Sequence, residues 1–288
     1  MRKKPRLLSS TRQSLQNTPS SLSSKQTRSV IRGHHTLRKQ LRQAVSGKNE
    51  GQVRALEASI NASGGLAQYQ RASIQGQSAD RGGDSSKVLL EWFADDNTFS
   101  SYKEPDGSAL RMLEVGALRV DNACARSKHF DIERIDLRSQ HPLIKQQDFM
   151  ERPVPDNVTT EGFDIVSLSL VLNFVDDATD RGEMLKRVAL FLRNGPHGRL
   201  SPRSPTPSLF LVIPSPCVDN SRYLDQSRLE DIMTALGYIL IRDKRSAKLA
   251  YYLWQWKGNV YMKKTSFRKQ EVRSGKMRNN FAIVLPCE

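Results

Sequence analysis

The sequence predicts an α/β fold in which a parallel sheet is covered by helices on both faces, preceded by a basic extension. Short apolar stretches of strand length alternate with stretches of helical periodicity between residues 110 and 214. The first strand ends in a glycine and the second in a carboxylate. Strands that alternate with helices are typical of parallel sheets, whose crossover helices cover both faces.

Four strands are predicted in the central part of the chain, at 110–116, 130–137, 163–170 and 209–214. A helix is predicted at 180–192, because its apolar residues recur at intervals of three and four. Beyond Gly237, three further strand candidates lie at 237–241, 249–256 and 281–285. Periodicity alone leaves open which two of them form the terminal hairpin.

Residues 1–87 form the predicted N-terminal extension, and residues 88–288 form the predicted compact domain. We expect disorder over 1–33, where Ser, Thr, Gln and Arg dominate. Two amphipathic helices are expected over about 36–62, with a break near residues 47–49. A flexible connection rich in Gly, Ser and Gln follows at 64–86.

The composition excludes several classes of protein. Hydrophobic residues make up 38% of the chain, and its apolar stretches are too short to span a bilayer. The N-terminus lacks the apolar run of a secretory signal, so we expect an intracellular protein. Cys124, Cys217 and Cys287 are far apart, and neither a disulfide framework nor a metal site is expected.

The net charge of +15 is concentrated at the two ends of the chain. Residues 1–87 contain 16 Lys and Arg against 4 Asp and Glu, a net charge of +12, and residues 241–280 have a net charge of +10. The stretch between them, 88–240, has a net charge of −6. Basic segments bind polyanions by releasing condensed counterions, which favours a nucleic-acid partner. The alternatives are an intracellular address label or a solvated linker.

Gly116 and Asp136 are the candidate cofactor-binding residues. In a parallel sheet a nucleotide-like ligand lies outside the carboxyl ends of the strands, where a glycine permits close approach of the backbone. A carboxylate at the end of the next strand, 20 residues beyond Gly116, can accept hydrogen bonds from both ribose hydroxyls. The Gly-x-Gly-x-x-Gly pattern for a pyrophosphate is absent, which favours a cofactor without phosphates.

These segments resemble successive motifs of class I S-adenosylmethionine methyltransferases, which have a Rossmann-like sheet. The segments that carry the resemblance are 113–118, 135–137, 147–149 and 163–175. Together with 214–217, 220–223 and the basic stretch 254–278, they resemble the fungal 25S ribosomal RNA adenine-N1 methyltransferases. The resemblance covers the chain from about residue 88 to the C-terminus, and more weakly the helical part of the extension.

The resemblance implies an enzyme of the nucleus and nucleolus that transfers a methyl group from S-adenosylmethionine to N1 of an adenine in large-subunit rRNA. It places Gly116 and Asp136 at the cofactor, with Glu114 supporting the first motif. Asp148 and Phe149 would flank the adenine of the cofactor. The implied partners are ribosomal RNA or a pre-60S particle, and we expect a monomer without a membrane or metal partner.

Methylation at adenine N1 requires little acid or base chemistry, because N1 has a free lone pair at neutral pH. Positioning and desolvation are expected to dominate. Asn173, at the carboxyl end of the third predicted strand, is a candidate for a hydrogen bond to the adenine edge. The Asn/Asp-Pro-Pro-aromatic motif of several nucleic-acid methyltransferases is absent there, since Phe174 and Val175 follow.

Two other functions fit the same cofactor residues. A non-catalytic S-adenosylmethionine sensor that binds a protein partner would need Gly116 and Asp136 equally, but it would not need basic flanks. A methyltransferase for a small molecule or a protein would leave the charge of residues 1–87 without a role.

Purely structural roles are also open for several of these residues. Gly116 can serve only the turn. Asp148 can cap a turn, and Phe149 can belong to the core. Asp176 and Asp177 follow the third predicted strand, where the substrate should arrive, which leaves a catalytic role open. They also precede a helix, whose N-terminal dipole such acids stabilise.

Overall fold

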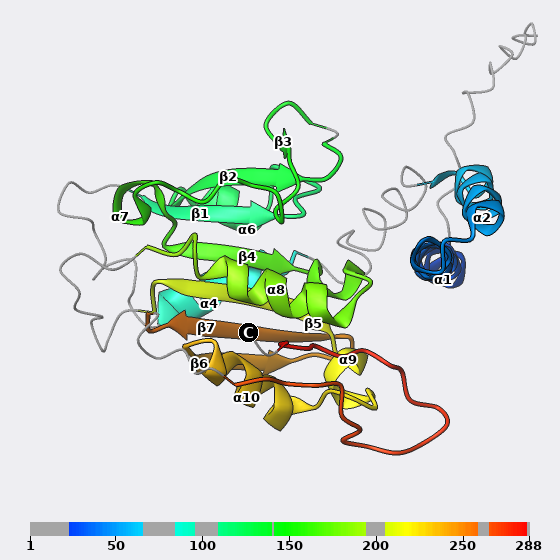
Figure 1. The fold of residues 1–288 in the computed structure, drawn as a ribbon. Coiled ribbons are helices and arrows are strands. Elements are labelled where there is room, and N and C mark those ends of the chain that lie inside the picture. Colours follow the sequence, from blue (N-terminus) through cyan, green and yellow to red (C-terminus); the bar gives the residue numbers. More distant parts are fainter. Residues whose placement is uncertain are drawn as a thin grey trace, which may run out of the picture.

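A seven-stranded mixed sheet forms the centre of the molecule (Figure 1). The structure is a computed structural model that describes residues 23–65, 84–95, 109–139, 141–193, 205–258 and 265–286. The strands follow the order β3-β2-β1-β4-β5-β7-β6. Their bounds are β1 Leu110–Val115, β2 Phe130–Asp136, β3 Lys145–Gln146, β4 Ile165–Ser169, β5 Ser208–Pro214, β6 Tyr238–Arg245 and β7 Leu249–Trp256.

The four strands predicted between residues 110 and 214 are confirmed as β1, β2, β4 and β5. Strands β3, β2, β1, β4 and β5 are parallel, whereas β7 is antiparallel to both β5 and β6. The parallel arrangement predicted for the four central strands is therefore confirmed. The terminal hairpin is β6–β7, and the third candidate, 281–285, is no strand and forms an isolated bridge from Leu285 to Phe267.

Helices cover both faces of the sheet, as predicted. One face carries α4 Ser86–Asp95 and α6 Ala123–Ser127. The other carries α8 Ala178–Val188, α9 Pro216–Asp219 and α10 Gln226–Ala235. The short elements α7 Val158–Glu161 and η1 Leu172–Phe174 flank β4 along the chain.

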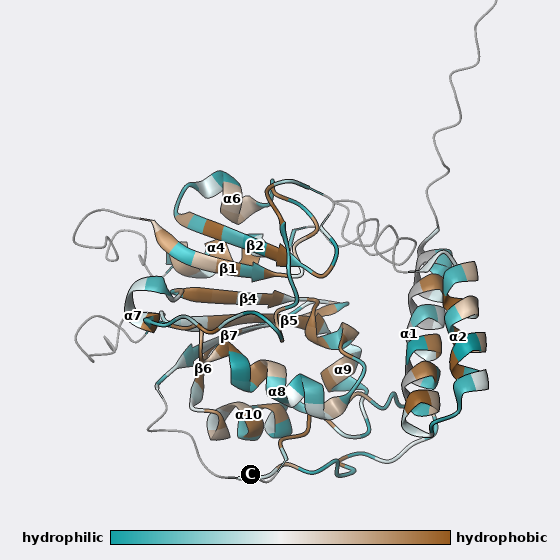
Figure 2. Cartoon of the chain, turned by 45° about the horizontal axis from the view of Figure 1, so that its top comes forward, coloured by the Kyte–Doolittle hydropathy of each residue, from teal (hydrophilic) through white to brown (hydrophobic). Residues whose placement is uncertain are grey.

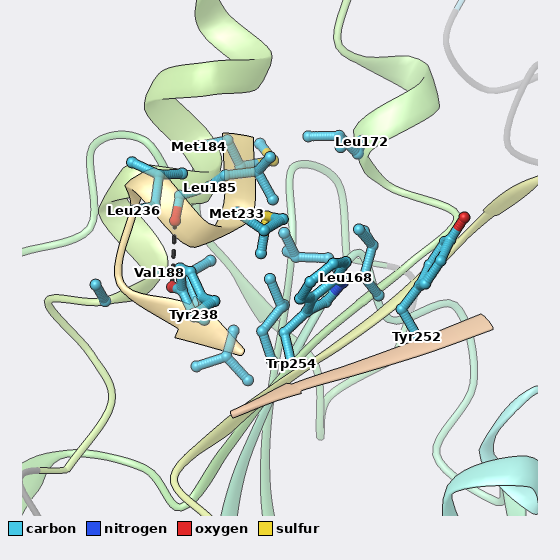
Figure 3. Packing of buried hydrophobic residues seen from close by; sticks show 14 of the residues in the cluster. Leu168, Leu172, Met184, Leu185, Val188, Met233, Leu236, Tyr238, Tyr252 and Trp254 are labelled. Atoms are coloured by element: carbon cyan, nitrogen blue, oxygen red, sulfur yellow. Dashed lines mark hydrogen bonds between the residues drawn. The ribbon is translucent and has the colours of Figure 1, made fainter. Parts of the chain in front are cut away.

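A separate hydrophobic cluster fills each side of the sheet. The central strands are the most apolar elements of the chain (Figure 2). Beneath α4, the rings of Trp92 and Phe210 meet edge to face, with centroids 6.0 Å apart. On the opposite side, Trp254 packs with residues of α8 and α10 (Figure 3). There the buried hydroxyl of Tyr238 donates to the carbonyl of Leu185 at 3.3 Å, which satisfies a polar group that would otherwise be costly to bury.

Two helices form the N-terminal extension, α1 Ser24–Ser46 and α2 Glu50–Ala62. Their break lies where the sequence predicts it. Helix α1, however, begins twelve residues before Thr36, so the expected disorder is wrong over residues 24–33. The capping box between Ser23 and Gln26 explains this early start, because it satisfies the first backbone N–H groups of the helix. Residues 1–22 lie outside the described residues.

The predicted domain boundary at residues 87 and 88 falls inside α4. Asp84 already belongs to the compact domain, since its carboxylate accepts hydrogen bonds from the backbone and hydroxyl of Ser86 and from the backbone of Ala123. These bonds join the starts of α4 and α6. The expected flexible connection therefore ends before Asp84, and residues 66–83 lie outside the described residues.

The described residues contain neither a helix long and apolar enough to cross a membrane nor a cluster of side chains suited to a metal ion. Cys124 and Cys217 are free thiols. Burial raises the pKa of each to about 12, so both stay protonated at neutral pH. Cys287 and most of the Pro/Ser-rich stretch 194–208 lie outside the described residues.

Candidate functional site

The predicted cofactor residues lie at or just beyond the carboxyl ends of three adjacent strands, β1, β2 and β3. Val115 pairs with Ile135, so Gly116 and Asp136 leave neighbouring strands at the same level. The N–H of Gly116 donates to the carbonyl of Ile135 at 2.8 Å. On the other side of β2, the N–H of Gln147 donates to the carbonyl of Asp136 at 2.9 Å. This places the segment 147–149 beside Asp136.

Gly116 occupies a position where no other residue fits. Its φ of +71° lies in the left-handed region, which favours glycine. A Cβ atom here would lie 2.6 Å from Cγ2 of Val171, closer than carbon atoms approach. The turn after β1 therefore requires glycine, and the bare backbone faces the end of β4. The predicted ligand role of Gly116 is compatible with this turn.

Asp136 is the last residue of β2, and its side chain is partly exposed. Its Oδ1 accepts a hydrogen bond from the N–H of Arg138 at 2.8 Å. That bond holds the carboxylate at the strand end, the position in which two ribose hydroxyls can donate to it.

Asp148 and Phe149 also have structural roles. Oδ1 of Asp148 accepts from the N–H of Met150 at 2.8 Å, as expected of a turn cap. The Phe149 side chain is 3% exposed and packs on Phe191, with ring centroids 5.2 Å apart. A ligand at this edge would therefore meet the backbone of Phe149, because its ring belongs to the core.

Glu114 is an acid at this edge whose surroundings shift its pKa. Its two carboxylate oxygens accept from the side-chain amide of Asn122 at 2.9 and 3.0 Å, and Nε of Arg134 lies 3.4 Å from Oε2. Burial raises the pKa of Glu114 to about 7, although Arg134 and Asn122 act in the opposite direction. Glu114 thus ties β1 to β2 and to the start of α6. Its role at the cofactor stays a prediction.

A cleft of about 640 Å³ opens at the carboxyl ends of the strands on the α4 side of the sheet. One wall contains Glu114 and Gly116 of the turn after β1. Ser167 and Ser169 of β4 line its middle. The opposite wall is formed by residues 246–248, between β6 and β7, and by Leu249 at the start of β7. The cleft thus leads from the candidate cofactor turn to the terminal hairpin.

The other predicted site residues lie outside this cleft. Asp136, Asp148, Phe149 and Asn173 do not line it. The predicted set therefore divides into two parts: Glu114 and Gly116 at the cleft, and the remaining cofactor residues along the ends of β2 and β3. Gly116, beside Ile135, connects the two parts.

Sequence reasoning missed the segment Asp84 to Ser86, which lines the cleft from the start of α4. The hydroxyl oxygens of Ser85 and Ser169 are 2.8 Å apart, so this segment is joined to the end of β4. The Gly/Ser composition just before it predicts a flexible linker. The one sequence signal of order here is Asp84, two residues before Ser86, because an aspartate side chain can cap the start of a helix.

Leu170 is the second missed residue of the cleft. Its φ of +59° is unusual for a bulky residue, and its N–H donates to the carbonyl of Val212 at 2.8 Å. Such a conformation costs about 1–3 kcal/mol, and strained residues of this kind cluster at functional sites. No sequence signal marks it, because leucine has no preference for this region.

Asn173 lies in η1, directly after β4. Its Oδ1 is buried and has no hydrogen-bond partner within the described part of the chain. Nearby, Asp177 caps α8 by accepting from the N–H of Thr179 at 2.7 Å, which confirms its predicted structural role. Asp176 forms an ion pair with Arg38 of α1, with Nε and Oδ2 3.6 Å apart, so the extension contacts the domain at this end of β4.

The residues of this edge fit the expected S-adenosyl cofactor. The turn at Gly116 excludes a side chain and leaves the backbone free to approach a ligand. Asp136 offers a carboxylate at the adjacent strand end. Nothing in the turn resembles the glycine-rich cradle that a pyrophosphate needs.

Comparison with known proteins gives one family. Residues 54–283 match the family described as 25S rRNA (adenine(2142)-N(1))-methyltransferase, Bmt2. The chain is 38% identical over 262 residues to the 25S rRNA adenine-N(1) methyltransferase of Schizosaccharomyces pombe, covering 90% of each protein. It is 40% identical over 228 residues to the 25S rRNA (adenine(2142)-N(1))-methyltransferase of Saccharomyces cerevisiae, covering 78% of this chain and 61% of that protein.

Solved structures resemble the chain only distantly. An O-methyltransferase of neocarzinostatin biosynthesis, solved with S-adenosyl-L-homocysteine, is 9% identical with a TM-score of 0.40, covering 79% of this chain and 70% of that chain. An O-methyltransferase family protein from Burkholderia thailandensis is 10% identical with a TM-score of 0.39, covering 83% and 75%.

Proposed function

This chain belongs to the family of 25S rRNA adenine-N(1) methyltransferases, and from that premise we propose that it methylates N1 of an adenine in 25S ribosomal RNA with S-adenosylmethionine as methyl donor. The observation that carries the proposal is the family match over 54–283, which includes every residue of the candidate site. The basic ends of the chain support an RNA substrate.

Bound S-adenosylmethionine supplies a methyl group on a positively charged sulfur, which the N1 lone pair accepts without prior loss of a proton. The protein therefore needs no general base. Its residues orient the two reactants and exclude water. Gly116 keeps the turn after β1 open for the cofactor, and Asp136 accepts hydrogen bonds from its ribose hydroxyls.

Glu114 holds the turn in place through Asn122 and Arg134. It acts as a positioning residue, because both of its oxygens are engaged by Asn122. Asn173 offers Oδ1 as an acceptor for the amino group of the target adenine. This amino group lies beside N1, so the contact would select adenine and orient its reacting edge.

The target edge of an adenine is hidden in a duplex, so the substrate adenine lies in a loop or is turned out of its helix. We further propose that the protein acts as a monomer on a pre-60S particle in the nucleolus. The basic extension supports this location, because basic segments retain proteins on rRNA-rich assemblies.

The direct test is incubation of the purified full chain with tritiated S-adenosylmethionine and an unmodified 25S rRNA transcript, followed by mapping of the label. We expect one labelled adenine, and loss of the label with Asp136→Ala. Tight cofactor binding without RNA labelling would instead indicate a sensor. Label on a base other than adenine would contradict the proposed specificity.

A further inference from the structure

A basic loop near the C-terminus, residues 268–278, projects past α9 as the orange to red segment of Figure 1. We call it the C-terminal loop. It contains five Lys and Arg against one Glu, a net charge of +4. The stretch that follows is anchored in the core, where Phe281, Ile283 and Leu285 are buried. The loop is therefore a charged protrusion on a firmly attached segment.

Backbone hydrogen bonds place the C-terminal loop at the carboxyl ends of the strands. The N–H of Asn279 donates to the carbonyl of Asn220 at 3.0 Å, and the N–H of Arg222 donates to the carbonyl of Asn279 at 2.9 Å. Asn220 directly follows α9, which begins just beyond the end of β5. Farther on, the N–H of Val284 donates to the carbonyl of Ala178 at 2.9 Å, at the start of α8. The loop thus shares the edge of the sheet on which the candidate site lies.

Two arginines fix the shape of the loop. The guanidinium of Arg222 donates to the carbonyl of Gly275 at 2.8 Å and to the side-chain amide oxygen of Asn280. In Arg278, Nε donates to the carbonyl of Ser274 at 2.6 Å, and Nη1 lies 3.4 Å from the amide oxygen of Asn220. All of these acceptors are neutral.

Neutral acceptors position a guanidinium without cancelling its charge. On the cofactor side the situation differs, because Arg119 donates to both carboxylate oxygens of Asp121 at 2.9 and 2.8 Å. Among the described residues, no carboxylate oxygen lies within 4 Å of the charged groups of Arg222, Lys276 or Arg278. The C-terminal loop therefore presents uncompensated positive charge, which a polyanion can neutralise.

Lys276 and Met277 form the exposed tip of the loop. Met277 is 91% exposed, more than any other large hydrophobic residue in the described part of the chain. A single exposed apolar side chain is common. This one, however, stands between two cations on a backbone held by Asn220, whose Nδ2 donates to the carbonyl of Met277 at 3.3 Å. Methionine is among the apolar side chains that nucleic-acid-binding proteins insert between bases, so the tip combines a phosphate ligand with a base contact.

We propose that the tip of the C-terminal loop binds the ribosomal RNA next to the target adenine, with Lys276 on a backbone phosphate and Met277 against an unstacked base. Arg222 and Arg278 hold the tip and add to its positive potential. The inference rests on the proposed function and adds a specific RNA-binding surface on the α8 side of the reactive edge. An acidic protein surface is the other polyanion that could meet the loop, and the experiment separates the two.

The test compares Lys276→Gln, Met277→Ala and Met277→Leu with the wild-type full chain. Lys128→Gln is the matched control, because Lys128 is an exposed lysine just before β2, at the opposite edge of the sheet. The measurements are Kd for a naked, unmodified 25S rRNA transcript by fluorescence anisotropy over a range of salt concentrations, methylation of that transcript, and cofactor Kd by calorimetry.

Lys276→Gln should raise the RNA Kd several-fold and reduce the slope of log Kd against log salt by about 0.7, the value for one phosphate of a single strand. Met277→Ala should also raise the RNA Kd several-fold, but with an unchanged slope because no charge is lost. Met277→Leu, Lys128→Gln and the cofactor Kd of all variants should stay near wild-type values.

A normal Kd for naked RNA in Lys276→Gln or Met277→Ala would overturn the proposal and favour an acidic protein surface as the partner. An equal loss of affinity in Lys128→Gln would overturn it too, since the effect would then reflect net charge alone. Wild-type protein that binds the transcript without methylating it would instead contradict the proposed function, while the RNA Kd values would still test the loop.

Discussion

Gly116 and Val171 are so close that the turn after β1 and the end of β4 form a single unit. A Cβ atom on Gly116 would lie 2.6 Å from Cγ2 of Val171. The valine begins the segment that leads through η1 to Asn173. The cofactor turn and the candidate substrate segment are therefore positioned against each other by direct contact.

Gly116→Ala should abolish measurable cofactor binding and destabilise the domain by about 1–3 kcal/mol, because it combines an unfavourable φ with a steric clash. Calorimetric titration with S-adenosylmethionine and urea unfolding check both effects. The control is Gly33→Ala, where a Cβ would meet no atom within 4 Å. Near-normal cofactor affinity in Gly116→Ala would show that the turn can shift without affecting the site.

Asp136→Asn should weaken cofactor affinity roughly 10- to 100-fold, since a hydrogen bond to a charged group contributes about 1.5–3 kcal/mol. Asp131→Asn, an exposed position on the same strand, should leave affinity unchanged. The informative comparison is between S-adenosylmethionine and an analogue without ribose hydroxyls. If Asp136 binds the ribose, the analogue should bind the wild type and the variant with similar affinity. A variant that still prefers the natural cofactor as strongly as the wild type would exclude the ribose contact.

The sequence alone predicts the strands that carry the candidate site, because buried parallel strands are short, apolar runs bounded by turns. It also predicts which residues share an edge. Gly116 and Asp136 end neighbouring strands, and their register follows from the chain order. The cleft itself could not be predicted in this way, since Ser85, Ser169 and Lys248 come from three distant parts of the sequence. Leu170 could not be predicted either, because nothing in the local sequence indicates its left-handed backbone.

Glu114 should make stability depend on pH. Its pKa is raised from an ordinary value of about 4.5 to about 7, so the folded protein retains a proton that the unfolded chain loses over this range. The contribution of Glu114 to stability is therefore fully present below pH 4.5 and is lost as pH rises through 7, by up to about 3 kcal/mol.

Urea unfolding of the wild type and of Glu114→Gln between pH 4.5 and 8 checks this prediction. The glutamine retains an acceptor for Asn122 but cannot ionise. The wild type should lose stability relative to the variant as pH rises, and the difference should level off above pH 7. Parallel stability curves would mean that Glu114 is already charged in the folded state at low pH.

Asn173→Ala should lower kcat/KM for RNA by roughly tenfold, the effect of one lost neutral hydrogen bond, without changing cofactor Kd. The predicted partner is the amino group of the target adenine. An RNA with purine in place of that adenine lacks this group, so its methylation should be impaired in the wild type. The variant should show little further difference between the two RNAs. Equal discrimination by the wild type and the variant would rule out this contact.

The N-terminal helices should contribute to RNA binding and not to cofactor binding. Residues 1–65 contain 13 Lys and Arg against 2 Glu, and α1 contacts the domain through Arg38 and Asp176. Deletion of residues 1–65 should weaken RNA association and reduce its salt dependence, while cofactor Kd remains unchanged.

Deletion through Lys87 should differ, because it also removes Asp84 and Ser86, which link the starts of α4 and α6. We expect the longer deletion to lose cofactor affinity and cooperative unfolding. Two deletions that behave alike in calorimetry and urea unfolding would contradict the domain boundary that the structure places before Asp84.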